Sequence, residues 1–345
     1  MSKEKKTKKG LKIFGIIVLV LIIILVLATG VAYLFVKNKL SKINTVDINV
    51  NELNVSTEVE QKLSGYRNIA IFGIDSRADN YDKGNRSDCI IIASINNDTK
   101  EVKLVSVYRD TYVQIEGYGL DKITHAYSYG EAPLAIKTLN TNLDLNIKEF
   151  VTVNFEAVVD CVDAIGGIEL DITSEELKYI NPYVHELNKV TKQSAEDITT
   201  AGKQHVNGVQ AVAYSRIRYT AGGDYKRAER MRTVITEIAN KLKTKSLAEI
   251  NSFTDTILPK VYTNISEDEI ISLIPSMMKY NITKSIGWPY ETRGKTIDRW
   301  YGVPVTLESN VTRLHKEIFG KSEYVPTKTV KNISNKIVQK TGYSK

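Results

Sequence analysis

The sequence has few of the residues that build metal clusters and disulfide-stabilised folds. Its 345 residues include two cysteines and four histidines. The histidines have no metal-ligand spacing, and Cys89 and Cys161 are too few for a disulfide framework or a zinc site. Each cysteine lies in an apolar stretch, which favours buried free thiols and leaves a single disulfide bond as the alternative. A fold that depends on zinc or on several disulfide bonds is therefore excluded.

Linkers and repeats are also missing. No stretch rich in proline or in glycine and serine divides the chain, and no motif recurs at a fixed period. With 42% hydrophobic and 25% charged residues, the chain has a globular composition and is long enough for one large domain or two small ones. The net charge of +7 favours an anionic partner such as nucleic acid, anionic lipid or a phosphorylated polymer.

Charge is absent from residues 13–36, a stretch long enough to span a bilayer. The preceding segment, 1–12, carries six lysines, against three lysines in 37–42. The positive-inside rule then places the N-terminus in the cytoplasm and everything after the stretch outside. Because no clear small-residue cleavage site follows, we expect an uncleaved anchor and not a signal peptide. This single-pass topology at the cell membrane argues against ATP-dependent chemistry and DNA binding.

This topology divides the chain into five segments. We expect a cytoplasmic basic tail (1–12), a transmembrane anchor (13–36), an extracellular stalk (37–64), an extracellular domain (65–325) and a basic C-terminal tail (326–345). The last segment is rich in lysine, and we expect it to be frayed.

The most informative stretch is 68–88, which has the pattern of a strand, a polar loop and the start of another strand. Asp75 and Arg77 follow the first apolar run, and Arg86 and Asp88 precede the second. Carboxylates at strand ends suit Mg²⁺, which prefers hard oxygen ligands and leaves positions open for phosphate. Arginines beside them suit phosphate oxygens. The stretch therefore indicates a metal–diphosphate site, and the alternative is a pair of surface salt bridges where the two strands meet.

Strands and helices alternate further along the chain. Residues 88–95 and 102–108 are predicted to form an antiparallel hairpin, because turn residues separate two apolar runs. The second strand ends at Arg109 and Asp110, which gives a second charged strand end. We predict helices over 132–143, 156–165, 225–243 and 310–319, and strands over 150–155, 168–172, 211–219 and 301–307.

The predicted strand 211–219 contains two more arginines. Side chains two residues apart share one face of a strand. Arg216 and Arg218 would then project together, with Ile217 on the opposite, apolar face.

A third group of arginines opens the predicted helix 225–243. Asp224 is a good N-cap for this helix, and Arg227 and Arg230 lie together in its first turns. Cations in that position oppose the helix dipole, which indicates that they hold an anion.

Taken together, these segments resemble the LytR-CpsA-Psr family of bacterial cell-envelope proteins. They match the family's order over about residues 65–243, and weaker matches such as SNVTRLHKEIFG extend the resemblance to about 320. A single anchor with the domain outside also fits. The matching pieces are NIAIFGIDSR, the RSD that follows it, KLVSVYRDTYV, DKITHAYSYGE, VNFEAVVDCVDAIGGIELDI, GVQAVAYSRIRYT and GDYKRAERMR.

The resemblance implies an α/β fold: a three-layer α-β-α domain with a central mixed β-sheet, preceded by one N-terminal transmembrane helix. It also implies transfer of a glycopolymer from a polyprenyl-diphosphate carrier to peptidoglycan. Some of the apolar core would line a channel for the lipid chain, which the sequence does not separate from ordinary core.

The resemblance also assigns roles to individual residues. Asp75 and Asp88 match the family's Mg²⁺ carboxylates. Asp110 and Asp224 match acidic positions near the site; Asp110 is either a general base or a group that orients Arg109. The diphosphate-binding arginines are matched by Arg77, Arg86, Arg109, Arg216, Arg218 and Arg227.

Two residues of the arginine-rich helix need separate comment. Arg230 is a further candidate for substrate binding, although helix-surface arginines are often merely solvated. Met231 departs from the family, because many members carry a glutamine there, and this puts a secondary polar contact in doubt.

From these observations we expect a membrane-anchored phosphotransferase. A peptidoglycan hydroxyl attacks the phosphorus next to the glycopolymer, a teichoic acid or capsule polymer, and polyprenyl phosphate leaves. Two alternatives stay open. A diphosphatase would use the same site with water as the acceptor, and a regulator without catalysis would fit the basic charge. The predicted topology and the absence of a recognisable DNA-reading helix pair oppose the regulator, and we expect no nucleic-acid partner.

Overall fold

The computed structural model describes residues 44–76, 81, 84–266, 268–270 and 278–344. The predicted anchor, 13–36, lies outside these residues, as does Arg77. Within the described part of the chain, no helix is both long enough and apolar enough to cross a membrane.

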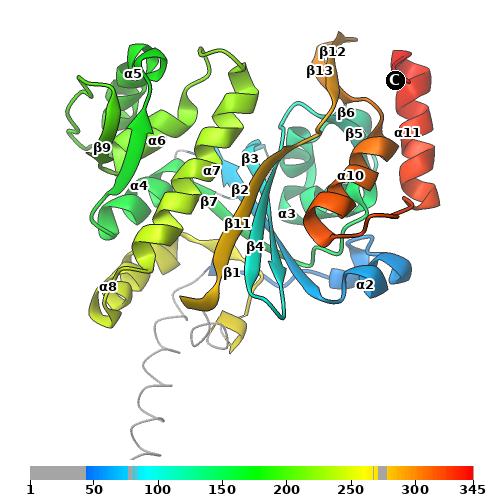
Figure 1. Ribbon diagram of the computed structural model, residues 1–345, viewed down its shortest axis with the longest axis horizontal. Helices are drawn as coiled ribbons and strands as arrows, with labels where there is room; N and C mark the ends of the chain where they lie inside the picture. Colours follow the sequence, from blue (N-terminus) through cyan, green and yellow to red (C-terminus); the bar gives the residue numbers. More distant parts are fainter. Residues whose placement is uncertain (1–43, 77–80, 82–83, 267, 271–277, 345) are drawn as a thin grey trace, which may run out of the picture.

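A mixed sheet of seven strands forms the centre of the molecule (Figure 1), in the order β1-β10-β7-β2-β3-β4-β11. The pairs β2–β3 and β3–β4 are antiparallel, as predicted for the hairpin, whereas β7 and β11 join the sheet in parallel to β2 and β4. The strands are β1 (Asn44–Thr45), β2 (Tyr66–Ile74), β3 (Ser87–Asn96), β4 (Glu101–Val107), β7 (Glu149–Asn154), β10 (Tyr262–Thr263) and β11 (Asn281–Trp288).

The alternation of side chains along the central strands sends apolar groups to both faces of the sheet. Ala70, Phe72 and Ile74 of β2 enter the larger hydrophobic core on one face. Ile71 of the same strand packs with Ile91 on the other face. Because both faces are apolar, both must be covered, and this accounts for helices on each side.

Helices cover the two faces in separate groups (Figure 1). α3 (Thr124–Leu143), α10 (Leu307–Phe319) and α11 (Lys328–Thr341) lie on one side, and α4 (Phe155–Ala164), α5 (Ser174–Thr191), α6 (Gly208–Arg216), α7 (Gly223–Leu242) and α8 (Leu247–Ile257) lie on the other. The second group has its own hydrophobic core, which includes Val159, Val184 and Val212. Shorter helical segments in the described part of the chain are α2 (Thr57–Leu63), η1 (Val50–Glu52) and η2 (Leu258–Lys260).

Among the described residues, three antiparallel two-stranded sheets lie outside the central sheet. The pair β5–β6 stands before α3, β8–β9 flanks α5, and β12–β13 precedes α10. Their strands are β5 (Tyr112–Ile115), β6 (Gly119–Lys122), β8 (Ile168–Ile172), β9 (Gly202–Val206), β12 (Thr292–Thr296) and β13 (Trp300–Pro304).

The predicted strand over 211–219 is wrong, because most of this segment is helix α6. Asn207 and Gln210 form a capping box that starts the helix: each side chain accepts a hydrogen bond from the other residue's backbone N–H at 3.0 Å. Every residue from Gly208 to Ser215 is buried except Gln210, which is half-buried. A helix buried on nearly all sides shows no continuous polar face, so its sequence lacks the helical period.

The stalk and tail predictions also need correction. Residues 326–345 were expected to form a frayed tail, but α11 buries Val330, Ile333 and Ile337 in the larger core. In the predicted stalk, β1 joins the central sheet and α2 buries Val59 and Leu63. The apolar residues of α2 and α11 are sparse, but their spacing places them on one side of each helix, and this is sufficient for the helix to pack against the core.

Candidate functional site

Asp88 stands at the centre of an arginine cluster at the start of β3. Its Oδ1 accepts a hydrogen bond from Arg109 Nη1 at 2.5 Å. Its Oδ2 accepts from Arg227 Nη2 at 2.9 Å and from Arg218 Nη2 at 3.1 Å. The three arginines come from the end of β4, from α7 and from the loop after α6. The fold thus gathers three of the predicted arginines around one predicted carboxylate.

The cluster carries more positive charge than Asp88 neutralises. Burial acts to raise the pKa of Asp88, but Arg227, Arg109 and Arg218 outweigh it and hold that pKa below its usual range. The pKa of Arg218 is lowered, first by burial and then by the neighbouring Arg227. Asp224 and Asp110 also pair with these arginines, and Lys122 adds a fourth cation. Four cations against three carboxylates leave a net positive charge, which stabilises a further anion.

Helix α7 brings Arg227 and Asp224 to the cluster. Arg227 is almost fully buried and donates a second hydrogen bond to Asp224 at 3.2 Å. The prediction that Asp224 caps this helix is wrong, because the N-cap is Gly222, whose φ of 89° places it in the left-handed region. Asp224 lies in the first turn, where a carboxylate suits the helix dipole and can balance the nearby arginines.

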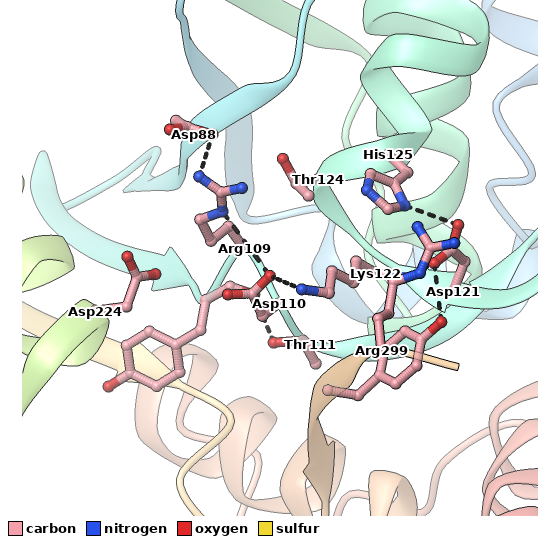
Figure 2. Close-up of polar contacts among 12 residues, drawn as sticks. Asp88, Arg109, Asp110, Thr111, Asp121, Lys122, Thr124, His125, Asp224 and Arg299 are labelled. Atoms are coloured by element: carbon pink, nitrogen blue, oxygen red, sulfur yellow. Dashed lines mark hydrogen bonds and ion pairs between the residues drawn. The ribbon is translucent and has the colours of Figure 1, made fainter. Parts of the chain in front are cut away.

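A line of polar contacts leads away from Asp88 through Arg109 (Figure 2). Asp110 lies 3.9 Å from Arg109 Nε and forms an ion pair with Lys122 of β6 at 2.7 Å. Beside this line, Asp121 accepts a hydrogen bond from Tyr129, and its carboxylate lies 2.8 Å from His125 Nδ1. Asp110 is therefore placed to orient Arg109, and Lys122 fixes Asp110.

The side chains of Arg216 and Arg218 point in different directions. It ends helix α6, and its Nη2 lies 3.2 Å from Glu186. Its guanidinium stacks over the rings of Phe155 and Tyr183, at 5.1 Å and 5.4 Å from the ring centroids. The pairing of Arg216 and Arg218 on one strand face is therefore wrong, since two residues at a helix end point in different directions.

Arg230 has a structural role in the fold, and its assignment to substrate binding stays a prediction. Its buried side chain donates to Glu176 at 2.6 Å, to the Ile217 carbonyl at 3.0 Å and to Thr220 Oγ1 at 2.6 Å. These bonds occupy the guanidinium within the protein. They hold the loop 217–222, which carries Arg218, against helix α7.

The remaining predicted residues lie near the start of β3. Asp75 is exposed directly after β2, and among the described residues no side chain pairs with it. The β2–β3 register places Ile74 opposite Ser87, so Asp75 and Asp88 lie at the same end of neighbouring strands. Arg86 is exposed. Ser87 Oγ is fully buried and has no hydrogen-bond partner in the described part of the chain.

Two carboxylates at one sheet edge fit a magnesium ion better than they fit a transition metal. No group of three or more His, Cys, Asp or Glu side chains forms a metal site within the described residues. Mg²⁺ needs no such cage, because it is commonly bound by one or two carboxylates together with water and substrate phosphates. Asp75 is available for this role, whereas Asp88 would share its oxygens with the arginines.

An apolar cavity of about 250 Å³ lies behind the cluster, between the sheet and helices α4, α6, α7 and α8. Its lining includes Ile71, Phe155 and Ile235. Cys89, the neighbour of Asp88, and Met231 line both this cavity and the small pocket around Asp88. Met231 therefore extends the apolar surface between the cavity and the pocket. Arg216 stacks on the ring of Phe155, which lines the cavity, and so lies next to it.

Both cysteines are free thiols, as predicted. Burial raises the pKa of Cys89 and of Cys161 to about 12, so each stays protonated at neutral pH. Both line the apolar cavity. They contribute packing surface and no charge to the site.

Sequence analysis missed the partners that hold the arginines and carboxylates in place. Lys122 lies in the DKITHAYSYGE motif, beside Asp121, and its position could have indicated a partner for Asp110. Glu176 and Glu186 lie in a polar segment that carries no visible motif, so nothing marked them as partners of Arg230 and Arg216.

Comparisons with known proteins give one consistent family. The model of the LytR_cpsA_psr family matches residues 31–314. The polyisoprenyl-teichoic acid–peptidoglycan teichoic acid transferase TagT of Bacillus subtilis (strain 168) is 31% identical over 304 residues, which is 85% of this chain and 91% of TagT. The corresponding transferase TagU of Enterococcus faecalis (strain ATCC 700802 / V583) is 35% identical over 206 residues, 59% of this chain and 62% of TagU.

A solved structure has the same fold. It is described as the LytR-CPS2A-psr family protein YwtF (TagT) with bound octaprenyl pyrophosphate lipid. The match covers 81% of this chain and 92% of the chain in that structure, with a TM-score of 0.51 and 21% sequence identity.

Proposed function

Because the chain belongs to the LytR-CpsA-Psr family, we propose that it transfers an anionic glycopolymer from a polyprenyl-diphosphate carrier to peptidoglycan. The glycopolymer is of the teichoic-acid or capsule kind, in keeping with the names of the TagT and TagU relatives. One observation carries the proposal: an arginine cluster with excess positive charge adjoins an apolar cavity. A diphosphate with a long hydrocarbon chain needs this combination.

The donor binds with its diphosphate at the cluster and its hydrocarbon chain in the cavity. Arg109, Arg218 and Arg227 turn from Asp88 towards the phosphate oxygens, which accept charge-assisted hydrogen bonds from the guanidinium forks. Arg216, next to the cavity, holds the end of the diphosphate nearest the lipid. Met231 and Ile235 contact the hydrocarbon chain.

The reaction is a phosphoryl transfer. A sugar hydroxyl of peptidoglycan attacks the phosphorus next to the glycopolymer, forming a new P–O bond. The bond from that phosphorus to the bridging oxygen breaks, polyprenyl phosphate leaves with the electron pair, and the proton lost by the hydroxyl passes to the released phosphate or to water. Such reactions depend mainly on positioning and charge stabilisation. Arg109, Arg218 and Arg227 stabilise the charge that develops on the leaving phosphate. Asp110, fixed by Lys122, orients Arg109.

Asp75 and Asp88 would hold a Mg²⁺ ion, which would neutralise charge on the diphosphate oxygens when bound. The support is their common position at one end of β2 and β3 and the lack of another partner for Asp75 among the described residues.

The protein is proposed to work at the outer face of the cell membrane, attached by residues 13–36. The proposal rests on the uncharged stretch and on the lysine-rich segment before it. An anchored enzyme stays where the lipid-linked donor resides.

The test is a product analysis with the purified full-length chain in detergent. A polyprenyl-diphosphate-linked polymer is incubated with and without peptidoglycan. We expect polymer attached to peptidoglycan and polyprenyl phosphate in equal amounts, and little release without peptidoglycan. Equal release of phosphorylated polymer in the absence of peptidoglycan would show a hydrolase and contradict the proposal.

A further inference from the structure

A second groove, separate from the apolar cavity, lies along the edge strand β11. Its volume is about 710 Å³, and it is open to solvent. Residues of α7, β11 and α10 form its walls, including Arg232, Ser285 and Arg313 (Figure 1 shows β11 between these two helices). Helix α7 therefore has the apolar cavity on one side and this polar groove on the other.

Arg232 is a buried cation with no carboxylate in ion-pair contact among the described residues. Its residue is only 5% exposed. Its Nε donates to Ser285 Oγ at 2.9 Å and its Nη1 makes a long contact of 3.4 Å with the Ala228 carbonyl. Within the described residues it forms no ion pair, and burial lowers its pKa. Burying an unpaired charge is costly, so a side chain placed this way is suited to an anion that enters from the groove.

Arg313 supplies a second guanidinium on the opposite wall. It is exposed and lies 4.4 Å from the centroid of the Tyr290 ring, without an ion-pair partner among the described residues. Two of the three carboxylates in the groove are already paired: Glu229 with Lys226 and Glu317 with Lys284. Glu229 also acts on Arg232, and Glu317 on Arg313. With Lys226 and Lys284 included, four cations face the three carboxylates, so the groove keeps a net charge of +1 that attracts anions.

The groove adjoins the arginine cluster. Tyr108, which lines the groove, is the residue before Arg109, and its ring packs against Tyr225 next to Asp224. The Ala228 carbonyl that contacts Arg232 also accepts a hydrogen bond from Ser106 Oγ, and both Ala228 and Ser106 line the pocket around Asp88. A chain that leaves the diphosphate on this side of α7 enters the groove.

We propose that this groove binds the phosphodiester groups of the donor's polymer, with Arg232 and Arg313 as the recognising residues. The inference rests on the proposed function and extends it, since it makes the enzyme favour donors whose polymer carries phosphate. Two guanidiniums on facing walls suit a polymer with repeated anions, and their planar forks match phosphate oxygens. The groove thus selects the polymer, while the cluster at Asp88 binds the diphosphate common to all donors.

The test uses the full-length chain in detergent and a lipid-free oligo(glycerol phosphate) as the probe. Calorimetry measures its affinity for wild type, Arg232→Gln, Arg313→Gln and Arg232→Lys. We expect each glutamine variant to lower the affinity about tenfold, because each removes a charge-assisted contact, and lysine to restore part of it. Arg293→Gln is the matched control, since Arg293 is also exposed and also lies over a tyrosine ring, at 5.8 Å from that of Tyr343, but outside the groove. It should bind like wild type.

A transfer assay with two donors gives the second measurement. One donor carries several polyol-phosphate units, and the other carries only an uncharged disaccharide on the same lipid diphosphate. Arg232→Gln and Arg313→Gln should raise KM about tenfold for the first donor and leave the second unchanged. Arg313 is exposed, so its variant should fold even if the Arg232 variant is unstable.

The outcomes separate this inference from the proposed function. If no donor supports transfer but oligo(glycerol phosphate) still binds in an arginine-dependent manner, the binding role of the groove is correct and the proposed reaction is wrong. Unchanged affinity for oligo(glycerol phosphate) in both glutamine variants would overturn the binding role of the groove. A muropeptide, a fragment of the acceptor, serves as a second probe. If the two glutamine variants lose muropeptide binding but keep oligo(glycerol phosphate) binding, the proposal is overturned and the groove is assigned to the acceptor.

Discussion

Arg227 Nη2 and Asp88 Oδ2 lie 2.9 Å apart, although 139 residues separate them in the chain. The pair joins helix α7 to strand β3, and both side chains are largely buried. Arg218 reaches the same oxygen from a loop, and 45% of its side chain is exposed. The cluster therefore has a buried pair that supports the fold and an exposed member whose function can be tested without disturbing the fold.

We predict that Arg218→Ala lowers the transfer rate by ~10²–10³, the usual effect of removing one preorganised donor from a developing charge. The melting temperature should change little, because exposed ion pairs contribute little stability. Arg218→Lys should restore only part of the rate, since lysine lacks the planar fork.

The neighbour Ile217 is the control for this measurement. It is fully buried, so Ile217→Ala should cost about 2–5 kcal/mol of unfolding free energy while the folded fraction keeps its rate. An Arg218→Ala protein that melts much earlier than wild type yet transfers at full rate would show that Arg218 is structural.

Arg230 should behave in the opposite way to Arg218. Arg230→Met leaves the buried carboxylate of Glu176 without its partner. We expect a loss of roughly 3–5 kcal/mol in urea unfolding, as for other broken buried pairs. The double variant Glu176→Gln with Arg230→Met should recover part of this loss. A single variant as stable as wild type would contradict the structural role.

The same pair gives a pH dependence. Burial acts to raise the pKa of Glu176, but Arg230 and Thr173 outweigh it and hold the pKa below its usual value. The unfolded-state value is about 4.3, so the pair stabilises above that pH, and its contribution is lost as the pH falls through the lowered folded-state value. Glu176→Gln should therefore differ most from wild type near pH 7, and the difference should shrink below about pH 4. A constant difference across this range would show that Glu176 is not ionised in the fold.

The sequence predicted the strands around the site better than the segment that carries Arg216 and Arg218. The run 68–74 is a short continuous apolar stretch with charged residues at its end, the pattern of a buried strand, and β2 confirms it. The run 211–215 is buried throughout, so its apolar residues carry no period, and only the capping box at Asn207 and Gln210 marks it as the start of a helix.

The arginines of α7 show a further limit of what can be predicted from the sequence. Arg227, Arg230 and Arg232 are all buried on one helix, yet they face Asp88, Glu176 and Ser285. Position along a helix gives the direction of each side chain but not its partner. Glu176, 54 residues away from Arg230, is brought to it only by the tertiary fold.

We predict that the dependence of turnover on Mg²⁺ requires both Asp75 and Asp88. Asp75→Ala should lower turnover strongly and leave the melting temperature unchanged, since Asp75 is exposed and pairs with no described residue. Asp88→Ala should lower turnover too, and should also destabilise the protein by leaving three arginines without their carboxylate. Turnover is measured with added Mg²⁺ and with a chelator. Full activity of both variants in the chelated buffer would rule out this metal site.

The apolar cavity predicts that donor affinity rises with lipid length. Burial of hydrocarbon contributes ~0.8 kcal/mol per CH₂ group, so a long polyprenyl diphosphate should bind far more tightly than a short one. Val158→Phe, which fills the cavity, should reduce this advantage. Val190→Phe places the same ring on the exposed face of α5 and should have no effect. Equal affinities of wild type for long and short donors would mean that the cavity holds no lipid.

The most direct test of the account is a crystal structure of the full-length chain with polyprenyl diphosphate. The account predicts phosphate oxygens within hydrogen-bonding distance of Arg109, Arg218 and Arg227, and hydrocarbon against Ile71 and Ile235. A lipid bound elsewhere, with Asp88 still holding all three arginines, would contradict it.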